Sequence, residues 1–526
     1  MPSIGETLIA QLRRYNVDVL FGIPGVHTLE LYRGLAESGI RHITPRHEQG
    51  AGFMADGYAR VTGKPGVALV ITGPGITNML TPMAQARADS VPLLVISSAN
   101  PDDSVGRGRG HLHELPDQFA TVSTIAAPAF NIQSADNLEI AIDDCFAAFE
   151  CKRPGPAYIQ LPLDIANLEA NAAVGAQLGP TPPLADRAQI KTAAAELSNA
   201  TSPIIIAGGG VKLDNERLTR LAERLDAPVI LTTNARGLMH DHPLVIPASP
   251  SLKVVRNLIE SADCVLALGT ELGRTDFDMY ETGGLPTMRN LIRVDIDLEQ
   301  LSRHNAQICL HSTVGDFLEK FEDVDIDRTK ISEAGAKHAQ RTREAAFDEI
   351  GSEMREITTI LDTIRSTSPK SIIVGDSTQP IYAGNLYYDH DRPGGWFNAS
   401  TGYGALGYGI PAAIGAAIGS PGDRVICLCG DGGAQFTLPE MMVAVEENLP
   451  IIFIIWNNHG YREIETSMEA AGITVIGCNP TPPDFQAVAQ SCRMAYRHCA
   501  INCVDVAATL EEALALNGPV MIELEA

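Results

Sequence analysis

The sequence lacks the features that would place the protein in a membrane or on nucleic acid. No apolar run approaches the roughly 20 residues of a membrane-spanning helix. Basic residues are scarce, with 39 Lys and Arg against 64 Asp and Glu, and the formal charge of −25 argues against nucleic acid and anionic membranes as partners. The first residues show no basic-then-apolar signal pattern. We therefore expect a cytoplasmic protein.

Metal-binding cysteine motifs are also missing. The ten cysteines are scattered without the short spacings of a metal site, so reduced, buried thiols are the plain interpretation. Cys427 and Cys429 lie two positions apart on a predicted strand, and we expect them to face opposite ways.

Length and composition indicate a large α/β protein. A chain of 526 residues with 47 glycines and 45% hydrophobic residues suits roughly three domains of strands and helices. We predict three doubly wound parallel sheets, in domains at residues 1–166, 186–325 and 356–526. The linker from 167 to 186 is rich in Ala, Gly and Pro, and a polar, charged stretch from 322 to 355 precedes the third domain.

The first and third domains share a pattern. In each, an apolar strand runs into a glycine turn, and a second apolar strand begins at a proline. The proline follows the glycine by 19 positions in one case (Gly73 to Pro92) and by 20 in the other (Gly430 to Pro450). This near-equal spacing predicts one doubly wound unit used twice.

The most informative motif is Gly430-Asp431-Gly432, followed by Asn457-Asn458. Each part closes an apolar strand, and residues 438–447 between them have helical periodicity. Asp431 and Asn458 should therefore lie at the carboxyl ends of two parallel strands, where open α/β sheets bind ligands.

These residue types suit a magnesium diphosphate. Mg²⁺ prefers about six oxygen ligands and usually shares them with substrate phosphates. Asp431 can give a carboxylate oxygen, Asn458 an amide oxygen and Gly460 a main-chain carbonyl, while the amides of Gly432 and Gly433 can face the phosphates. A plain turn is the alternative for Gly-Asp-Gly alone.

This segment resembles the thiamin-diphosphate motif of the acetolactate synthase (acetohydroxyacid synthase) and 2-oxo-acid decarboxylase superfamily. Residues 43–60 are similar to the family's glutamate segment along their whole length, which gives Glu48 the role of the catalytic base on the cofactor. The alternative for Glu48 is a charge that favours a helix N-terminus. Gly52, Ala55 and Ala59 share one face of the predicted helix and would let another helix pack closely.

The resemblance continues toward the C-terminus. Residues 400–415 are similar to the segment that bends the cofactor, with Leu406 as the wedge and the carbonyl of Gly404 as acceptor for the pyrimidine amine. Residues 375–379 look like a second diphosphate-facing loop, with Ser377 and Thr378, opposite Gly430; a simple Ser/Thr turn is the alternative.

The resemblance also implies an assembly. The first domain would grip the pyrimidine and the third the diphosphate, with each site formed between two subunits of a homodimer or a dimer of dimers.

Two segments depart from the acetolactate synthase pattern. His113 stands where a glutamine is expected, with no lysine in the dozen positions after it. Residues 269–276 differ from the usual flavin-contacting run, which makes FAD doubtful.

Ionisable residues suggest a polar substrate pocket. His27 and His113 are candidate catalytic groups, and Glu114, Glu463 and Glu465 are further candidates for the substrate; for each, a solvated loop or helix start is the alternative. We predict a thiamin-diphosphate- and Mg²⁺-dependent enzyme acting on 2-oxo acids, similar to acetolactate synthase. The alternatives are a flavin-free decarboxylase of a polar, for example guanidino-tailed, 2-oxo acid and, more remotely, a non-catalytic cofactor-binding regulator.

Overall fold

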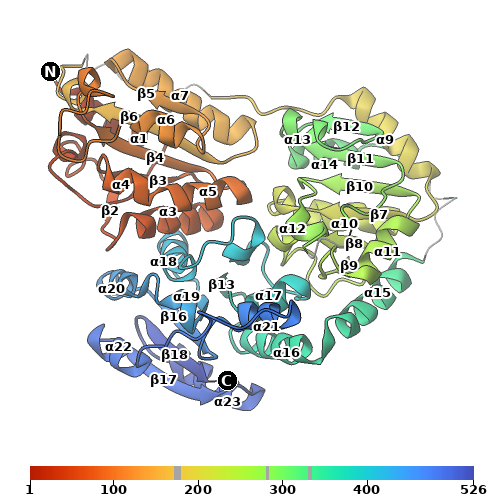
Figure 1. Cartoon of the computed structure of the whole chain (residues 1–526). Helices are drawn as coiled ribbons and strands as arrows, with labels where there is room; N and C mark the ends of the chain where they lie inside the picture. Colours follow the sequence, from red (N-terminus) through yellow and green to blue (C-terminus); the bar gives the residue numbers. More distant parts are fainter. Residues whose placement is uncertain (171–178, 280–282, 328, 330–333, 526) are drawn as a thin grey trace.

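The computed structural model describes residues 1–170, 179–279, 283–327, 329 and 334–525. Three sheets of six strands, each flanked by helices, make up the molecule (Figure 1). Every strand pairing within them is parallel, for example those of β3, β10 and β15 with their neighbours. This confirms the predicted fold class of three doubly wound parallel sheets. Residues 171–178 of the predicted linker lie outside the described part of the chain.

The N-terminal sheet has the strand order β2-β1-β3-β4-β6-β5. Its strands are β1 (Val19–Gly22), β2 (Arg41–Ile43), β3 (Gly66–Val70), β4 (Leu93–Ala99), β5 (Ala129–Asn131) and β6 (Pro156–Pro162). Its helices are α1 (Ile4–Arg14), α2 (Leu29–Tyr32), α3 (Glu48–Thr62), α4 (Pro74–Asn78), α5 (Leu80–Asp89), α6 (Gln118–Ser123), α7 (Ala135–Cys151) and α8 (Leu163–Ala166).

The central sheet has the order β12-β11-β10-β7-β8-β9. Its strands are β7 (Pro203–Ala207), β8 (Val229–Leu231), β9 (Val245–Ile246), β10 (Cys264–Leu268), β11 (Leu291–Asp295) and β12 (Ile308–His311). Its helices are α9 (Arg187–Asn199), α10 (Asn215–Leu225), α11 (Lys253–Ser261), α12 (Arg274–Phe277), α13 (Leu298–Ser302) and α14 (Val314–Glu322). The predicted polar stretch contains α15 (Gly335–Glu349) and the start of α16 (Gly351–Thr367).

The C-terminal sheet has the order β14-β13-β15-β16-β18-β17. Its strands are β13 (Ile372–Gly375), β14 (Trp396–Asn398), β15 (Val425–Gly430), β16 (Ile451–Asn457), β17 (Ala495–Ala500) and β18 (Val520–Glu525). Its helices are α17 (Gln379–Leu386), α18 (Gly409–Gly419), α19 (Asp431–Ala434), α20 (Met441–Glu446), α21 (Arg462–Ala470), α22 (Phe485–Ser491) and α23 (Cys503–Leu514).

The N- and C-terminal sheets have the same topology. Numbered from the first strand of each, both follow the order 2-1-3-4-6-5, whereas the central sheet follows 6-5-4-1-2-3. The glycine turn after the third strand and the proline before the fourth occupy equivalent places in the two domains. The prediction of one unit used twice is confirmed.

Helix α3 joins these two domains. It begins where the His47 ring nitrogen accepts a hydrogen bond from the Gln49 amide, and it ends at Gly63, whose φ of 70° suits a helix C-terminus. It lies beside α18 (Figure 1), and a Cβ on Gly57 would come within 2.0 Å of the Ala412 carbonyl oxygen. Helix α3 also packs closely through the predicted face, where a Cβ on Gly52 would come within 2.4 Å of Pro82 of α5.

One strand expectation was wrong. Residues two apart on a strand share a face, and the sulfur atoms of Cys427 and Cys429 lie 3.2 Å apart in the buried core. All ten cysteines are free. Within the described ranges, each helix is too short or too polar to cross a bilayer.

Candidate active site

The Gly-Asp-Gly turn lies where the sequence predicts it. Strands β15 and β16 run in parallel with Gly430 opposite Trp456, so that Asp431 and Asn458 emerge side by side from their carboxyl ends. Asp431 is fully buried, and burial raises the pKa of its carboxyl group. Its Oδ2 has no hydrogen-bond partner among the described residues. A buried carboxylate oxygen without a partner is costly, so Oδ2 is placed to meet a ligand.

Three oxygens converge at this turn. The side-chain oxygen of Asn458 lies 3.1 Å from Asp431 Oδ1 and 3.0 Å from the carbonyl oxygen of Gly460. The Asn458 amide nitrogen points the other way and donates to Gln379 Oε1 at 3.1 Å. An amide turned the other way would donate to both oxygens, but the Gln379 Oε1 beside it already accepts from Trp456 Nε1 at 3.2 Å and favours the Asn458 nitrogen as its second donor. In that orientation three oxygens face one another, and the predicted ligand set fits Mg²⁺. In the described part of the chain, no group of three His, Cys, Asp or Glu residues is placed to hold a metal.

A cavity of about 410 Å³ opens above the turn. It collects every C-terminal residue that the sequence assigns to the cofactor or the metal. These lining residues are Ser377, Thr378, Gly404, Leu406, Gly430, Asp431, Gly432, Gly433, Asn458 and Gly460. A volume of this size is typical of a site for a small organic ligand.

The segment from Ala399 to Leu406 forms one wall of the cavity. Ser400 Oγ lies 2.9 Å from Ser377 Oγ, which ties the two predicted cofactor loops together. Gly404 has a φ of 76°, a conformation that a side chain would strain, and Thr437 donates to the Gly407 carbonyl at 2.9 Å. These contacts present the Gly404 backbone and the Leu406 side chain to the cavity.

The two candidate glutamates of α21 differ. Glu463 lines the cavity, hydrogen-bonds Gln379 and has its pKa raised by burial. Glu465 instead forms an ion pair with Arg462. Only Glu463 is therefore available to a ligand in the cavity.

The other predicted residues lie on the N-terminal domain. Glu48 begins α3, and its Oε2 accepts a hydrogen bond from Asn78 Nδ2 at 3.0 Å. The rings of His27 and His113 meet edge to face at 5.3 Å, each with a buried Nδ1 that has no hydrogen-bond partner among the residues that the structure describes. Burial and the neighbouring His113 lower the pKa of His27. Glu114 is engaged within its own loop, where it accepts hydrogen bonds from the amides of Arg109, Gly110 and His111.

The 410 Å³ cavity takes its walls from the central and C-terminal domains, and none of these N-terminal side chains lines it. Exposed apolar side chains surround both parts. On the N-terminal domain they are Val26, Leu29 and Leu112, and on the C-terminal domain they are Tyr403, Phe436 and Ile464.

Three family models match the chain. They are described as the N-terminal TPP-binding domain, the central domain and the C-terminal TPP-binding domain of thiamine pyrophosphate enzymes, and they match residues 2–121, 190–321 and 376–524. The chain belongs to the thiamine pyrophosphate enzyme family. It is thus an enzyme that uses thiamin diphosphate. The turn at Gly430, Asp431 and Gly432 lies in its C-terminal TPP-binding domain.

Full-length relatives agree with this assignment. The chain is 41% identical to a probable 2-ketoarginine decarboxylase of Pseudomonas aeruginosa, over 94% of this chain and 89% of that protein. It is 28% identical to the acetolactate synthase isozyme 1 large subunit of Escherichia coli, over 99% and 93%. It is 30% identical to an acetolactate synthase large subunit of Corynebacterium glutamicum, over 86% and 74%.

A second cavity, of about 400 Å³, lies between the three domains of this thiamine pyrophosphate enzyme. It borders the glycine turn 208–210 and Gly269, at the carboxyl ends of β7 and β10, where the strand order of the central sheet reverses. Among the described residues, none lines both cavities.

Sequence reasoning missed Glu440, which contacts the backbone just before Glu48. Glu440 follows the metal turn by nine positions, and its carboxylate accepts hydrogen bonds from the amides of Arg46 and His47, next to Glu48. Burial raises the pKa of Glu440 to about 7. The only signal in the sequence was a glutamate near the start of a predicted helix, which is ordinarily a solvent-exposed position.

Proposed function

We propose that this enzyme decarboxylates a 2-oxo acid with a cationic, guanidino-like tail and releases an aldehyde. The bond to the carboxylate breaks, CO₂ leaves, and a proton takes its place on the carbonyl carbon. Thiamin diphosphate, when bound, supplies the carbon centre that accepts the electrons of the broken bond. In the proposed site, Asp431, Asn458 and Gly460 hold Mg²⁺ and the diphosphate.

The carboxylate of Glu463 carries this proposal. It lines the cavity that contains Asp431, beside Gln379, and forms no ion pair within the described part of the chain, whereas Glu465 is paired with Arg462. A half-buried carboxylate without a cation would bind a guanidinium group by a charge-assisted hydrogen bond. The 41% identity to the probable 2-ketoarginine decarboxylase supports the same substrate class.

The groups proposed to transfer protons lie together in the N-terminal domain. Glu48 would hold the proton that activates the cofactor, fixed in place by Asn78. His27 and His113 would serve as the neighbouring proton-transfer groups, and burial lowers the pKa of His27, which favours the neutral imidazole that can accept a proton.

We propose that a second copy of the chain completes the site. Glu48 does not line the cavity of its own chain. Exposed apolar side chains lie around the N-terminal half-site, which is Glu48 with His27 and His113, and around the C-terminal half-site, which is the 410 Å³ cavity. Docking the N-terminal half-site of one copy on the C-terminal half-site of another would form two complete sites in a dimer. We assign the enzyme to the cytoplasm, in keeping with its free thiols. The proposed reaction involves no oxidation and needs no FAD.

A product assay tests the proposal. The protein, thiamin diphosphate and Mg²⁺ are mixed with pyruvate or with a panel of polar 2-oxo acids, and CO₂, aldehyde and acetolactate are followed together. We expect CO₂ and aldehyde in equal amounts from the guanidino-tailed acid. Acetolactate from pyruvate would instead establish the synthase function, which the relatives at 28% and 30% identity represent. A yellow purified protein would contradict the flavin-free reaction.

A further inference from the structure

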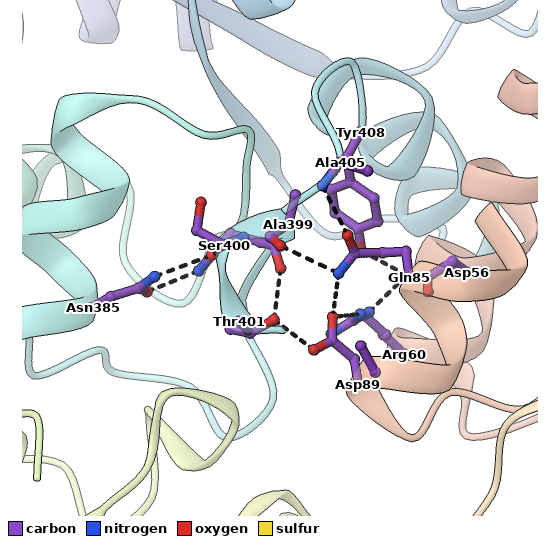
Figure 2. A network of polar contacts seen from close by, with 12 residues as sticks. Asp56, Arg60, Gln85, Asp89, Asn385, Ala399, Ser400, Thr401, Ala405 and Tyr408 are labelled. Atoms are coloured by element: carbon purple, nitrogen blue, oxygen red, sulfur yellow. Dashed lines mark hydrogen bonds and ion pairs between the residues drawn. The ribbon is translucent and has the colours of Figure 1, made fainter. Parts of the chain in front are cut away.

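One buried glutamine holds both ends of the segment that bends the cofactor. Gln85 lies on α5 of the N-terminal domain and is fully buried. Its Nε2 donates to the carbonyl of Ala399 at 3.3 Å, and its Oε1 accepts from the amide of Ala405 at 3.2 Å. Figure 2 shows the side chain reaching across from α5 to this segment. A single side chain thus contacts the segment near its first residue, Ala399, and near its last, at Ala405.

Charged neighbours fix the position of Gln85. Its Nε2 also donates to Asp89 Oδ2 at 2.7 Å, and Arg60 donates to the same oxygen at 2.6 Å. Arg60 further donates to Asp56 at 2.7 Å, and Asp56 accepts from the hydroxyl of Tyr408 at 2.5 Å. The Asp56, Arg60 and Asp89 side chains are at most 8% exposed. Hydrogen bonds to buried charges are strong and directional, so the glutamine has little freedom to turn.

A second contact from the same cluster reaches the middle of the loop. Thr401 Oγ1 donates to Asp89 Oδ1 at 2.6 Å (Figure 2). The next residues, Gly402 to Gly404, line the cofactor cavity, while Thr401, Arg60 and Asp89 line the second cavity. The loop is therefore a wall between the two cavities, held on one side by the N-terminal domain.

We propose that Gln85 is a positioning residue for the cofactor, acting through the segment from Ala399 to Leu406 of its own chain. The proposal rests on the proposed function, in which Gly404 and Leu406 contact the cofactor. Without the two bonds from Gln85, Gly404 and Leu406 would occupy several positions, and the cofactor would have to order them on binding. The N-terminal domain would then serve two sites, with Gln85 ordering its own chain's loop and Glu48 acting in the partner's site.

The test replaces Gln85 by methionine, which has a similar shape but cannot make these bonds. The dissociation constant of thiamin diphosphate is measured at fixed Mg²⁺ by fluorescence quenching, and kcat and KM are measured at saturating cofactor. We expect the dissociation constant to rise by roughly tenfold, and KM for the 2-oxo acid to change by less than about threefold. Gln11→Met is the matched control, because Gln11 is another buried glutamine of the same domain, on α1.

A milder variant guards against misfolding. Thr401→Val removes one hydrogen bond to Asp89 and leaves every charge in place, so it should weaken cofactor binding by a smaller factor, roughly threefold. If Gln85→Met and Thr401→Val both bind thiamin diphosphate within twofold of Gln11→Met, Gln85 is not a positioning residue. If the unaltered protein binds the cofactor but produces no CO₂ from any 2-oxo acid, the proposed function fails while the role of Gln85 is still decided by the binding data. If the unaltered protein does not bind the cofactor, both proposals are overturned.

Discussion

The N- and C-terminal domains present the same turn at the end of their third strand and use it in opposite ways. In the N-terminal domain, Gln118 fills the turn. Its Oε1 accepts from the Thr72 hydroxyl at 2.7 Å and from the Gly73 amide at 3.0 Å. In the C-terminal domain, the turn itself carries Asp431, whose Oδ2 has no partner among the described residues. A shared topology therefore does not make a site; an unsatisfied polar group at the right position does.

Substitutions in the two domains should affect different steps, with turnover lost at Glu48 and cofactor binding lost at Asp431. Replacing Glu48 by Gln should lower turnover by roughly a thousandfold, because general acid-base groups contribute factors of this size. Cofactor affinity should change little. Asp431→Asn should instead lose Mg²⁺ and thiamin diphosphate, as measured by titration calorimetry. A Glu48→Gln enzyme that turns over at the rate of the unaltered protein would remove Glu48 from the mechanism.

The free energy of unfolding should depend more on the N-terminal turn than on the C-terminal turn. Gln118 is 7% exposed and also donates to Ser97, Tyr158 and Gln160. Gln118→Ala should therefore lower the free energy of unfolding by roughly 2 to 4 kcal/mol, whereas Asp431→Asn removes an uncompensated charge and should raise it slightly in the absence of cofactor. The midpoint temperature of the first thermal unfolding transition, compared with that of the unaltered protein, measures both effects. A stable Gln118→Ala variant would show that the N-terminal turn is not held by this side chain.

Glu440 follows Asp431 by nine positions and contacts the backbone just before Glu48. Its contribution to the free energy of unfolding should depend on pH. Burial raises its pKa to about 7, above the ordinary value of 4.5. The stability that protonated Glu440 contributes is therefore fully present below pH 4.5 and is lost as the pH rises through 7. Between pH 4.5 and pH 7, the free energy of unfolding of the unaltered protein should fall by roughly 3 kcal/mol relative to that of Glu440→Gln, because the glutamine cannot ionise. Urea unfolding of both proteins at pH 5 and pH 8 measures the difference; parallel profiles would contradict it.

The smallest expected effect distinguishes the two glutamates of α21. Glu463→Gln should raise KM for the guanidino-tailed acid by roughly tenfold and leave an uncharged 2-oxo acid unaffected, because it removes one charge-assisted bond to the tail. Glu465→Gln should change KM by less than about twofold, because that carboxylate is committed to Arg462. Equal effects of the two substitutions in steady-state assays would remove Glu463 from the tail site.

The strands and the metal turn could be predicted from the sequence because their signals are local. The apolar strands expected before Gly430 and before Asn458 are present as Val425–Gly430 and Ile451–Asn457, and the turn needed only its glycines, its aspartate and the spacing to Asn458. Gln85 could not be predicted, since its partners Ala399 and Ala405 lie 314 and 320 positions away. Gln118 and Glu440 acquire their roles in the same way, from tertiary contacts. The error over Cys427 and Cys429 was of another kind, because the alternation of strand side chains already contradicts it.

The separation of Glu48 from the cavity of its own chain has a genetic consequence. If each site combines the Glu48 of one copy with the Asp431 of the other, a Glu48→Gln chain and an Asp431→Asn chain are both inactive alone but complement each other when mixed. Half of the sites in such a mixed dimer carry both native groups and half carry neither. Two defective alleles in one cell would then restore up to half of the activity per mixed dimer, whereas a dimer of one defective and one unaltered chain would keep one active site, so the defective chain would not lower the activity contributed by its partner.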